Sequence, residues 1–213
     1  MHRVLRDQAY AVCLARRAIR AATPRAVPLN HTWGVDLTGR QDNAGQTRTI
    51  LGALDHGSRR VLALRVVAAK SGWHLLGYLC LAIGEFGKPK FIRTDNERCF
   101  TGKVFSTGLK WLGIGHQRIG LHCPWQNGRI ERFFGTLKQY LKQWQFEGRV
   151  ALSVSLVEFA AWYNAIRPHQ NLAGLTPLEA WHAVDPFQAP APPKEIVFVQ
   201  GWDGLLCGFH FRR

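Results

Sequence analysis

The sequence predicts an α/β fold whose five-stranded mixed sheet has the order βββαβαβα and is flanked by helices. Two observations support this. Between residues 30 and 67, apolar residues alternate with polar or small ones in three short runs, which is the period of strands. After residue 70, segments with apolar residues three and four positions apart alternate with two short apolar runs, as in helices that connect strands.

The first three predicted strands form an antiparallel unit. In the first, the alternate residues from Trp33 to Leu37 are apolar, so Asp36 lies on the opposite face. The runs Thr49–Leu54 and Val61–Val67 follow, joined by Asp55–Ser58. We expect the aspartate of this connection to stabilise the turn through bonds to nearby backbone amides.

The next part of the chain alternates helices and strands. Ser71 is expected to cap a helix through Phe86, and a second helix is expected at Lys103–Leu112. The predicted strands are Phe91–Thr94 and Ile114–Ile119. Asp95 therefore follows the end of a strand, where ligands gather in mixed α/β sheets.

The following helix carries one carboxylate near its start. One face of the helix is apolar, with Ile130, Phe133, Phe134, Leu137, Tyr140, Leu141 and Trp144 at helical spacing. Glu131 has Gly128 and Gly135 as its same-face neighbours, so a metal ion and a phosphate would fit beside it. Taken alone, Glu131 fits a solvated glutamate stabilised by the helix dipole better than a ligand. Other carboxylates must decide between these readings.

Two capping boxes are predicted further on. Ser155-x-x-Glu158 is expected to begin a helix through Ile166, and Thr176-Pro177-x-Glu179 a shorter helix through Ala183. The last segment alternates apolar residues around Asp203-Gly204, which predicts a β-hairpin. A hairpin this short should pack on the core, on a second subunit or on DNA.

We therefore expect three regions. They are a basic N-terminal helix and linker (1–29), a catalytic core (30–185), and a proline-rich linker with a β-hairpin tail (186–213). The N-terminal helix fits contact with DNA and a plain solvated helix equally well.

The composition points to a polyanionic partner. The chain has 28 Lys and Arg against 14 Asp and Glu, a formal charge of +14, so nucleic acid is the leading candidate. A ribosomal or chromatin-like protein would share this charge. The five cysteines form no Cys-x-x-Cys pair, as in a reducing cytoplasm, and no apolar run is long enough to span a membrane.

Three separated carboxylates suggest a metal site. Asp36, Asp95 and Glu131 would repel one another if they converged with nothing between them, whereas divalent cations remove that cost. Mg²⁺ prefers oxygen ligands and is commonly held by one or two carboxylates plus phosphate. Two such ions can activate the attacking oxygen and stabilise the leaving oxygen of an in-line displacement.

The motifs around these carboxylates resemble a known family. Trp33-Gly34-Val35-Asp36, Thr94-Asp95-Asn96 and the run Pro124–Glu131 are similar to the catalytic core of DDE transposases and retroviral-type integrases. The segment from Tyr163 to Ala180 resembles the part that closes the core in bacterial insertion-sequence transposases. The likeness covers about residues 30 to 183.

The resemblance implies an RNase H-like fold with Asp36, Asp95 and Glu131 as the catalytic triad. It implies two Mg²⁺ ions, for which Mn²⁺ would substitute. Supporting positions are expected in the Asp95 loop and at the start of the Glu131 helix, and DNA contacts around that helix. The supporting positions are Asn96, Asn127 and Gly128, and the DNA contacts are Trp125, Arg129, Arg132, Lys138 and Lys142.

The implied function is that of a polynucleotidyl transferase, with 3′-end hydrolysis followed by strand transfer to target DNA. Implied partners are DNA ends and target, further copies of the chain, and no membrane; the implied location is a bacterial nucleoid. Two departures stand out. Glu97-Arg98-Cys99 replaces the usual glycine and acidic residue before Phe100, and no helix-turn-helix is evident before Asn30. Hence a truncated or split transposase with a separate helix-turn-helix subunit, a nuclease without joining activity, and a non-catalytic regulatory fragment stay open.

Overall fold

The structure is a computed structural model that describes residues 26–120, 123–187 and 195–212. The predicted basic helix at the N-terminus lies outside these residues. Within the described ranges, no helix has the length and apolar character needed to cross a membrane.

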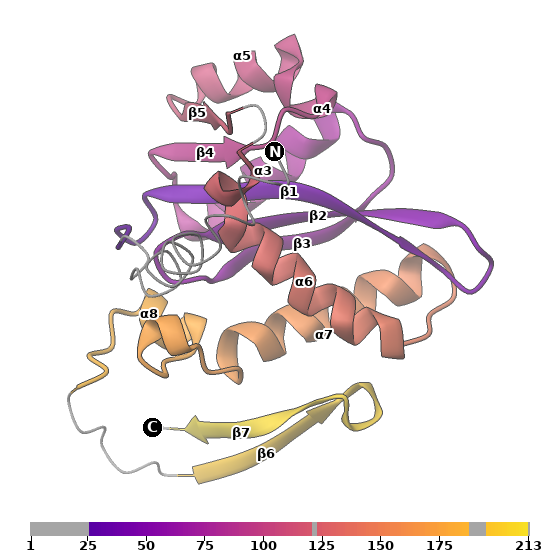
Figure 1. Ribbon diagram of the computed structural model, residues 1–213, viewed down its shortest axis with the longest axis vertical. Helices are drawn as coiled ribbons and strands as arrows, with labels where there is room; N and C mark the ends of the chain where they lie inside the picture. Colours follow the sequence, from indigo (N-terminus) through magenta and orange to yellow (C-terminus); the bar gives the residue numbers. More distant parts are fainter. Residues whose placement is uncertain (1–25, 121–122, 188–194, 213) are drawn as a thin grey trace, which may run out of the picture.

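Five strands form one mixed sheet in the order β3-β2-β1-β4-β5 (Figure 1). The strands are β1 Thr32–Gln41, β2 Thr47–Asp55, β3 Val61–Val67, β4 Phe91–Thr94 and β5 Gly115–Arg118. The first three are antiparallel neighbours, β4 pairs parallel to β1, and β5 pairs parallel to β4. The predicted five-stranded mixed sheet is confirmed.

Helices cover both faces of the sheet, so the core has three layers (Figure 1). One face holds α3 Gly72–Phe86, α4 Arg98–Thr101 and α5 Lys103–Trp111, which pack on Trp33, Val35 and Ile92. The other face holds α6 Gly128–Gln143 and α7 Gly148–Ala165 over residues such as Ile50 and Leu64. A 3₁₀ turn, η1 Pro124–Asn127, leads into α6, and the short helix α8 Pro177–Trp181 follows α7 and a second 3₁₀ turn, η2 Gln170–Leu172.

Two of the three predicted caps are present. The Ser71 side chain accepts a hydrogen bond from the His74 amide at the start of α3. Thr176 and Glu179 form the reciprocal bonds of a capping box at α8, which ends at Trp181 rather than Ala183.

The third predicted cap is wrong, because α7 begins seven residues before Ser155. Gly148 has a φ of 71°, which suits a glycine where the chain turns into the helix. The Ser155 hydroxyl lies inside α7, donates to the Ala151 carbonyl and accepts from the Trp144 indole. Its hydrogen-bonding capacity is therefore used within the packed helix rather than at a helix start.

The C-terminal hairpin docks on α7, which confirms that it packs on the core. Its strands are β6 Glu195–Gly201 and β7 Leu206–Arg212, joined through a 3₁₀ turn, η3 Trp202–Gly204. Trp144 ends α6 instead of continuing its apolar face, and its ring stacks on Trp202 at 5.1 Å between centroids. The Trp162 indole donates to the Cys207 carbonyl. These contacts join the hairpin to α6 and α7.

Two buried glycines let the start of α6 approach the sheet. A Cβ at Gly52 of β2 would lie 2.7 Å from the Phe134 ring, and one at Gly34 of β1 would lie 2.5 Å from His56 Nε2 and 3.4 Å from Asn127 Oδ1. Neither position has room for a side chain unless α6 or His56 shifts.

We therefore expect Gly52→Ala to force α6 away from the sheet and to lower the free energy of unfolding by roughly 1–3 kcal/mol. Urea unfolding measures this change. Gly77→Ala is the matched control, because a Cβ at this α3 position meets nothing within 4 Å and alanine favours a helix. Equal stability changes for the two variants would contradict the tight packing of α6.

Candidate active site

The strand register brings Asp36 and Asp95 together. Gly34 of β1 pairs with Arg93 of β4, and both strands run in the same direction. Two residues further along, β1 reaches Asp36 and the chain leaving β4 reaches Asp95. Trp33 and Val35 fill the core beneath α3, so alternation directs Asp36 to the α6 face of the sheet.

Local backbone bonds orient both carboxylates. Oδ1 of Asp36 accepts from the Leu37 amide at 2.8 Å, and Oδ1 of Asp95 accepts from the Glu97 amide at 3.0 Å. Among the described residues, the second oxygen of each carboxylate has no hydrogen-bond partner. Each aspartate is thus fixed through one oxygen and presents the other to a ligand.

Glu131 faces this pair from the first turn of α6. It is exposed, and a Cβ at Gly128 or Gly135 would meet nothing within 4 Å, so the space beside it is open. Burial, followed by the negative charges of Asp95, Glu131 and Glu97, raises the pKa of Asp36 to about 7. Asp95 and Glu131 are therefore close enough to Asp36 for their charges to act on it.

The carboxylates are of the chemical type that binds a divalent cation, but they do not form a closed coordination site in this structure. Over the described part of the chain, no three His, Cys, Asp or Glu side chains are grouped tightly enough to hold a metal ion. Their oxygens are the ligands that Mg²⁺ prefers, and a cation would remove the repulsion that raises the pKa of Asp36.

The loop after Asp95 departs from the family motif in sequence, but it still leads into α4 and the core. Glu97 precedes α4, and its carboxylate forms an ion pair with Lys70 at 2.9 Å. Phe100 is fully buried in the core, as the motif requires. The Asn96 side chain donates to the Ile119 carbonyl and so ties the Asp95 loop to the end of β5. The sequence did not single out the Glu97–Lys70 pair.

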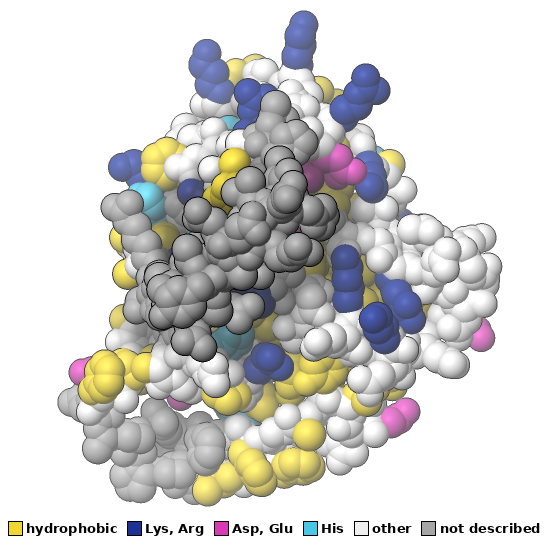
Figure 2. Space-filling view, viewed as in Figure 1, with side chains coloured by type: hydrophobic (Ala, Val, Ile, Leu, Met, Phe, Trp, Pro, Cys, Tyr) yellow, Lys and Arg dark blue, Asp and Glu magenta, His cyan; other side chains and the backbone are white. Residues whose placement is uncertain are grey.

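The other predicted residues lie around α6 but differ in how exposed they are. Asn127 is buried at the N-cap position without a capping bond. Trp125 is 72% exposed, as expected of a residue open to contact. Lys138 and Lys142 are exposed on the helix. Figure 2 shows Lys and Arg side chains over this side of the molecule, with far fewer acidic ones.

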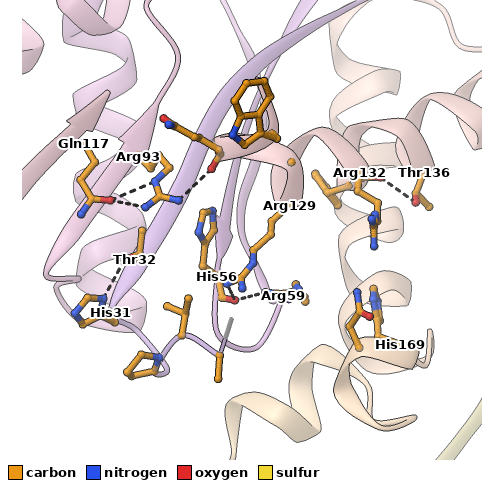
Figure 3. A pocket seen from close by; sticks show the side chains of 18 of the residues that line it. His31, Thr32, His56, Arg59, Arg93, Gln117, Arg129, Arg132, Thr136 and His169 are labelled. Atoms are coloured by element: carbon orange, nitrogen blue, oxygen red, sulfur yellow. Dashed lines mark hydrogen bonds between the residues drawn. The ribbon is translucent and has the colours of Figure 1, made fainter. Parts of the chain in front are cut away.

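Arg129 and Arg132 do not face the carboxylates. They line a cavity of about 930 Å³ on the other side of the start of α6, together with Arg59, Arg93 and Arg167 (Figure 3). The sequence analysis missed this cavity. Strand alternation could have indicated part of it, since Arg93 is two residues before Asp95 and so lies on the same face of the sheet.

Comparison with solved structures identifies the class of fold. The catalytic core domain of HTLV-2 integrase, in complex with magnesium and in a trimeric form, aligns with a TM-score of 0.59 at 22% identity. The alignment covers 74% of this chain and all of that one. The fold is thus that of integrase catalytic cores, which confirms the RNase H-like prediction.

Sequence comparisons agree with the fold. Residues 112–177 match the family described as "Integrase core domain". The uncharacterized proteins of insertion elements IS476 from Xanthomonas euvesicatoria and IS407 from Burkholderia multivorans are each 29% identical, over 70% and 79% of this chain. The chain spans 44% and 61% of their lengths. Fold, motifs and sequence matches together support a DDE transposase/integrase core.

The raised pKa of Asp36 predicts a pH-dependent gain in stability for Asp36→Asn. In the parent, the carboxyl titrates near pH 3.8 when unfolded and near 7 when folded, so its contribution to stability is lost as pH rises between these values. In EDTA, Asp36→Asn should be more stable than the parent at pH 8 by roughly 1–3 kcal/mol, after allowance for solvent screening, and by little at pH 4.

Urea unfolding at the two pH values measures this difference. Asp203→Asn, at an exposed turn, is the control and should show no such pH dependence. Added Mg²⁺ should stabilise the parent at pH 8 and narrow its gap to Asp36→Asn. A gap of the same size at both pH values would contradict the predicted repulsion.

Proposed function

We propose that this protein is a metal-dependent DNA transposase or integrase whose catalytic carboxylates are Asp36, Asp95 and Glu131. The observation that supports the proposal is that the charges of Asp95 and Glu131, from the end of β4 and from α6, reach Asp36 on β1. Burial, followed by these charges, raises the pKa of Asp36. Such an arrangement costs folding free energy and is explained by a cationic ligand.

Mg²⁺ ions bound there, with Mn²⁺ as a substitute, would supply an activated attacking oxygen and stabilise the leaving oxygen of a phosphodiester. The chain's own part is to position the groups. Backbone amides of Leu37 and Glu97 hold the two aspartates, and the exposed Glu131 closes the site from the side. Lys70 offsets the charge of Glu97 next to them.

The proposed reaction has two steps. Hydrolysis of a phosphodiester at the end of a mobile element frees a 3′-hydroxyl, and this hydroxyl then attacks a target-strand phosphodiester by transesterification. Exposed Trp125, Lys138 and Lys142, with Arg129 and Arg132, are proposed DNA contacts. The excess of basic residues supports a DNA partner, since neutralised phosphates release counterions.

The similarity to bacterial insertion-element proteins supports mobile-element DNA as the substrate and the bacterial nucleoid as the place of action. The trimeric form recorded for the HTLV-2 core supports further copies of the chain as partners. A separate helix-turn-helix subunit that recognises the DNA ends is proposed as well.

A strand-transfer assay on oligonucleotides carrying the element's ends tests the triad. Asp95→Asn and Glu131→Gln should each lower the rate of 3′-end hydrolysis and joining by roughly 100-fold or more, because each removes a charge that holds the catalytic ions. Glu158→Gln is the matched control, since Glu158 is exposed on α7 away from the three elements that form the site. It should keep the parental rate.

The products separate the alternatives. Cleaved but never joined strands would indicate an RNase H-fold nuclease. A biological effect on transposition that survives Asp95→Asn and Glu131→Gln would indicate a non-catalytic, regulatory chain. Parental rates in both triad variants would show that the triad assignment is wrong.

A further inference from the structure

We propose that the arginine-lined cavity beside the start of α6 is a second nucleic-acid site, which binds a backbone phosphate one or two nucleotides from the scissile phosphate on the same DNA strand. This proposal rests on the proposed function for the identity of the ligand as DNA. It adds a site that the triad does not contain, with Arg59, Arg93 and Arg167 as new contacts beside Arg129 and Arg132.

The charged side chains of the described cavity wall are all arginines. Its described lining includes five arginines and three histidines and neither Asp nor Glu. Within the described residues, the ion pairs are Arg48–Asp42 and Lys70–Glu97, both elsewhere. Burial, followed by the charges of Arg59 and Arg93, lowers the pKa of Arg129 to about 10. An anion in the cavity would remove this repulsion.

Arg93 and Arg59 are held in place by neutral acceptors of the described residues. Arg93 donates to the Gln117 side chain at 2.8 and 3.2 Å and to the Gln126 carbonyl at 3.0 Å. Arg59 and Arg129 both donate to the His56 carbonyl. Guanidinium groups fixed in this way are pre-organised for the oxygens of a phosphate.

His56 is a buried polar group whose hydrogen-bonding capacity is not used. It lines the cavity, is 2% exposed, and its Nε2 has no partner among the described residues. Figure 3 shows its ring between Arg93 on one side and Arg59 and Arg129 on the other. His169, across the cavity, likewise has a buried Nε2 without a partner in the described chain. The His56 Nε2 points toward Gly34 and Asn127 beneath α6, so only the Nε2 of His169 is offered as a polar group for a ligand in the cavity.

The position of the cavity indicates which phosphate it would bind. Arg93 and Asp95 are two residues apart along one extended segment, hence roughly 6–7 Å apart on the same face of the sheet. Phosphates of one DNA strand are spaced about 3.4 Å along the helix axis. A strand whose scissile phosphate lies at Asp95 would therefore place a phosphate one or two nucleotides away at the mouth of the cavity.

Arg93→Gln and Arg132→Gln test the site by binding of a short fluorescent DNA duplex in EDTA, where no strand is cut. Each variant should weaken binding about tenfold, the value of one charge-assisted hydrogen bond. Each should also reduce the slope of log affinity against log salt by about 0.9, the effect of one phosphate contact. Arg149→Gln, an equal charge change at the exposed start of α7, should leave affinity within about twofold and keep the cavity intact.

The outcomes decide the proposal and separate it from the triad. Unfolding midpoints must match the parent, because Arg93 also supports the η1 turn through Gln126; Arg132 has no such bond from its guanidinium in the described residues. If Arg93→Gln, Arg132→Gln and Arg149→Gln all lose the same DNA affinity, the effect is one of net charge and the proposed site is wrong. A different result would show that DNA is not the ligand. In that case inorganic phosphate stabilises the parent but not Arg93→Gln, while the two proteins bind DNA equally well. The binding assay contains EDTA and no cutting occurs in it, so failure of the triad variants in catalysis leaves this test valid.

Discussion

Helix α6 can bring Glu131 to the sheet only because residues beneath it lack side chains. Gly52 receives the Phe134 ring, and Gly34 receives the His56 ring and the Asn127 side chain. The apolar face of α6 then fills the core between the sheet and α7, including Phe133 and Leu137. Close packing of this kind fixes the helix to within a few tenths of an ångström. Glu131 would act more weakly on Asp36 if α6 lay one side-chain width further from the sheet.

The same helix separates two electrostatic environments. On one side, burial and then neighbouring negative charges raise the pKa of Asp36; on the other, burial and then neighbouring positive charges lower the pKa of Arg129. Each set is unfavourable by itself, and each would be relieved by an ion of opposite charge. A DNA strand with bound metal ions carries cations and, at neighbouring positions, phosphate anions. One such ligand could therefore neutralise the charges on both sides of α6.

Sequence reasoning placed the strands and α3, because alternation and helical spacing are local signals. It misplaced the start of α7, since Ser155 and Glu158 match a capping pattern although Ser155 bonds inside the helix to Ala151 and Trp144. It also missed the arginine-lined cavity. Arg59, Arg93 and Arg167 are separated by 34 and 74 residues, and only tertiary packing brings them to one wall.

Because α6 packs closely on the sheet, its rotation about its own axis is fixed. This limits which changes of sequence the start of the helix can accept. Successive residues of a helix are turned by about 100°, so removing one residue between Asn127 and Glu131 would carry Arg132 into the place of Glu131. The acidic side would receive a cation, and the basic side would lose one. A substitution at this helix start changes one side chain, whereas a change of length there would turn every following side chain to another face of the helix.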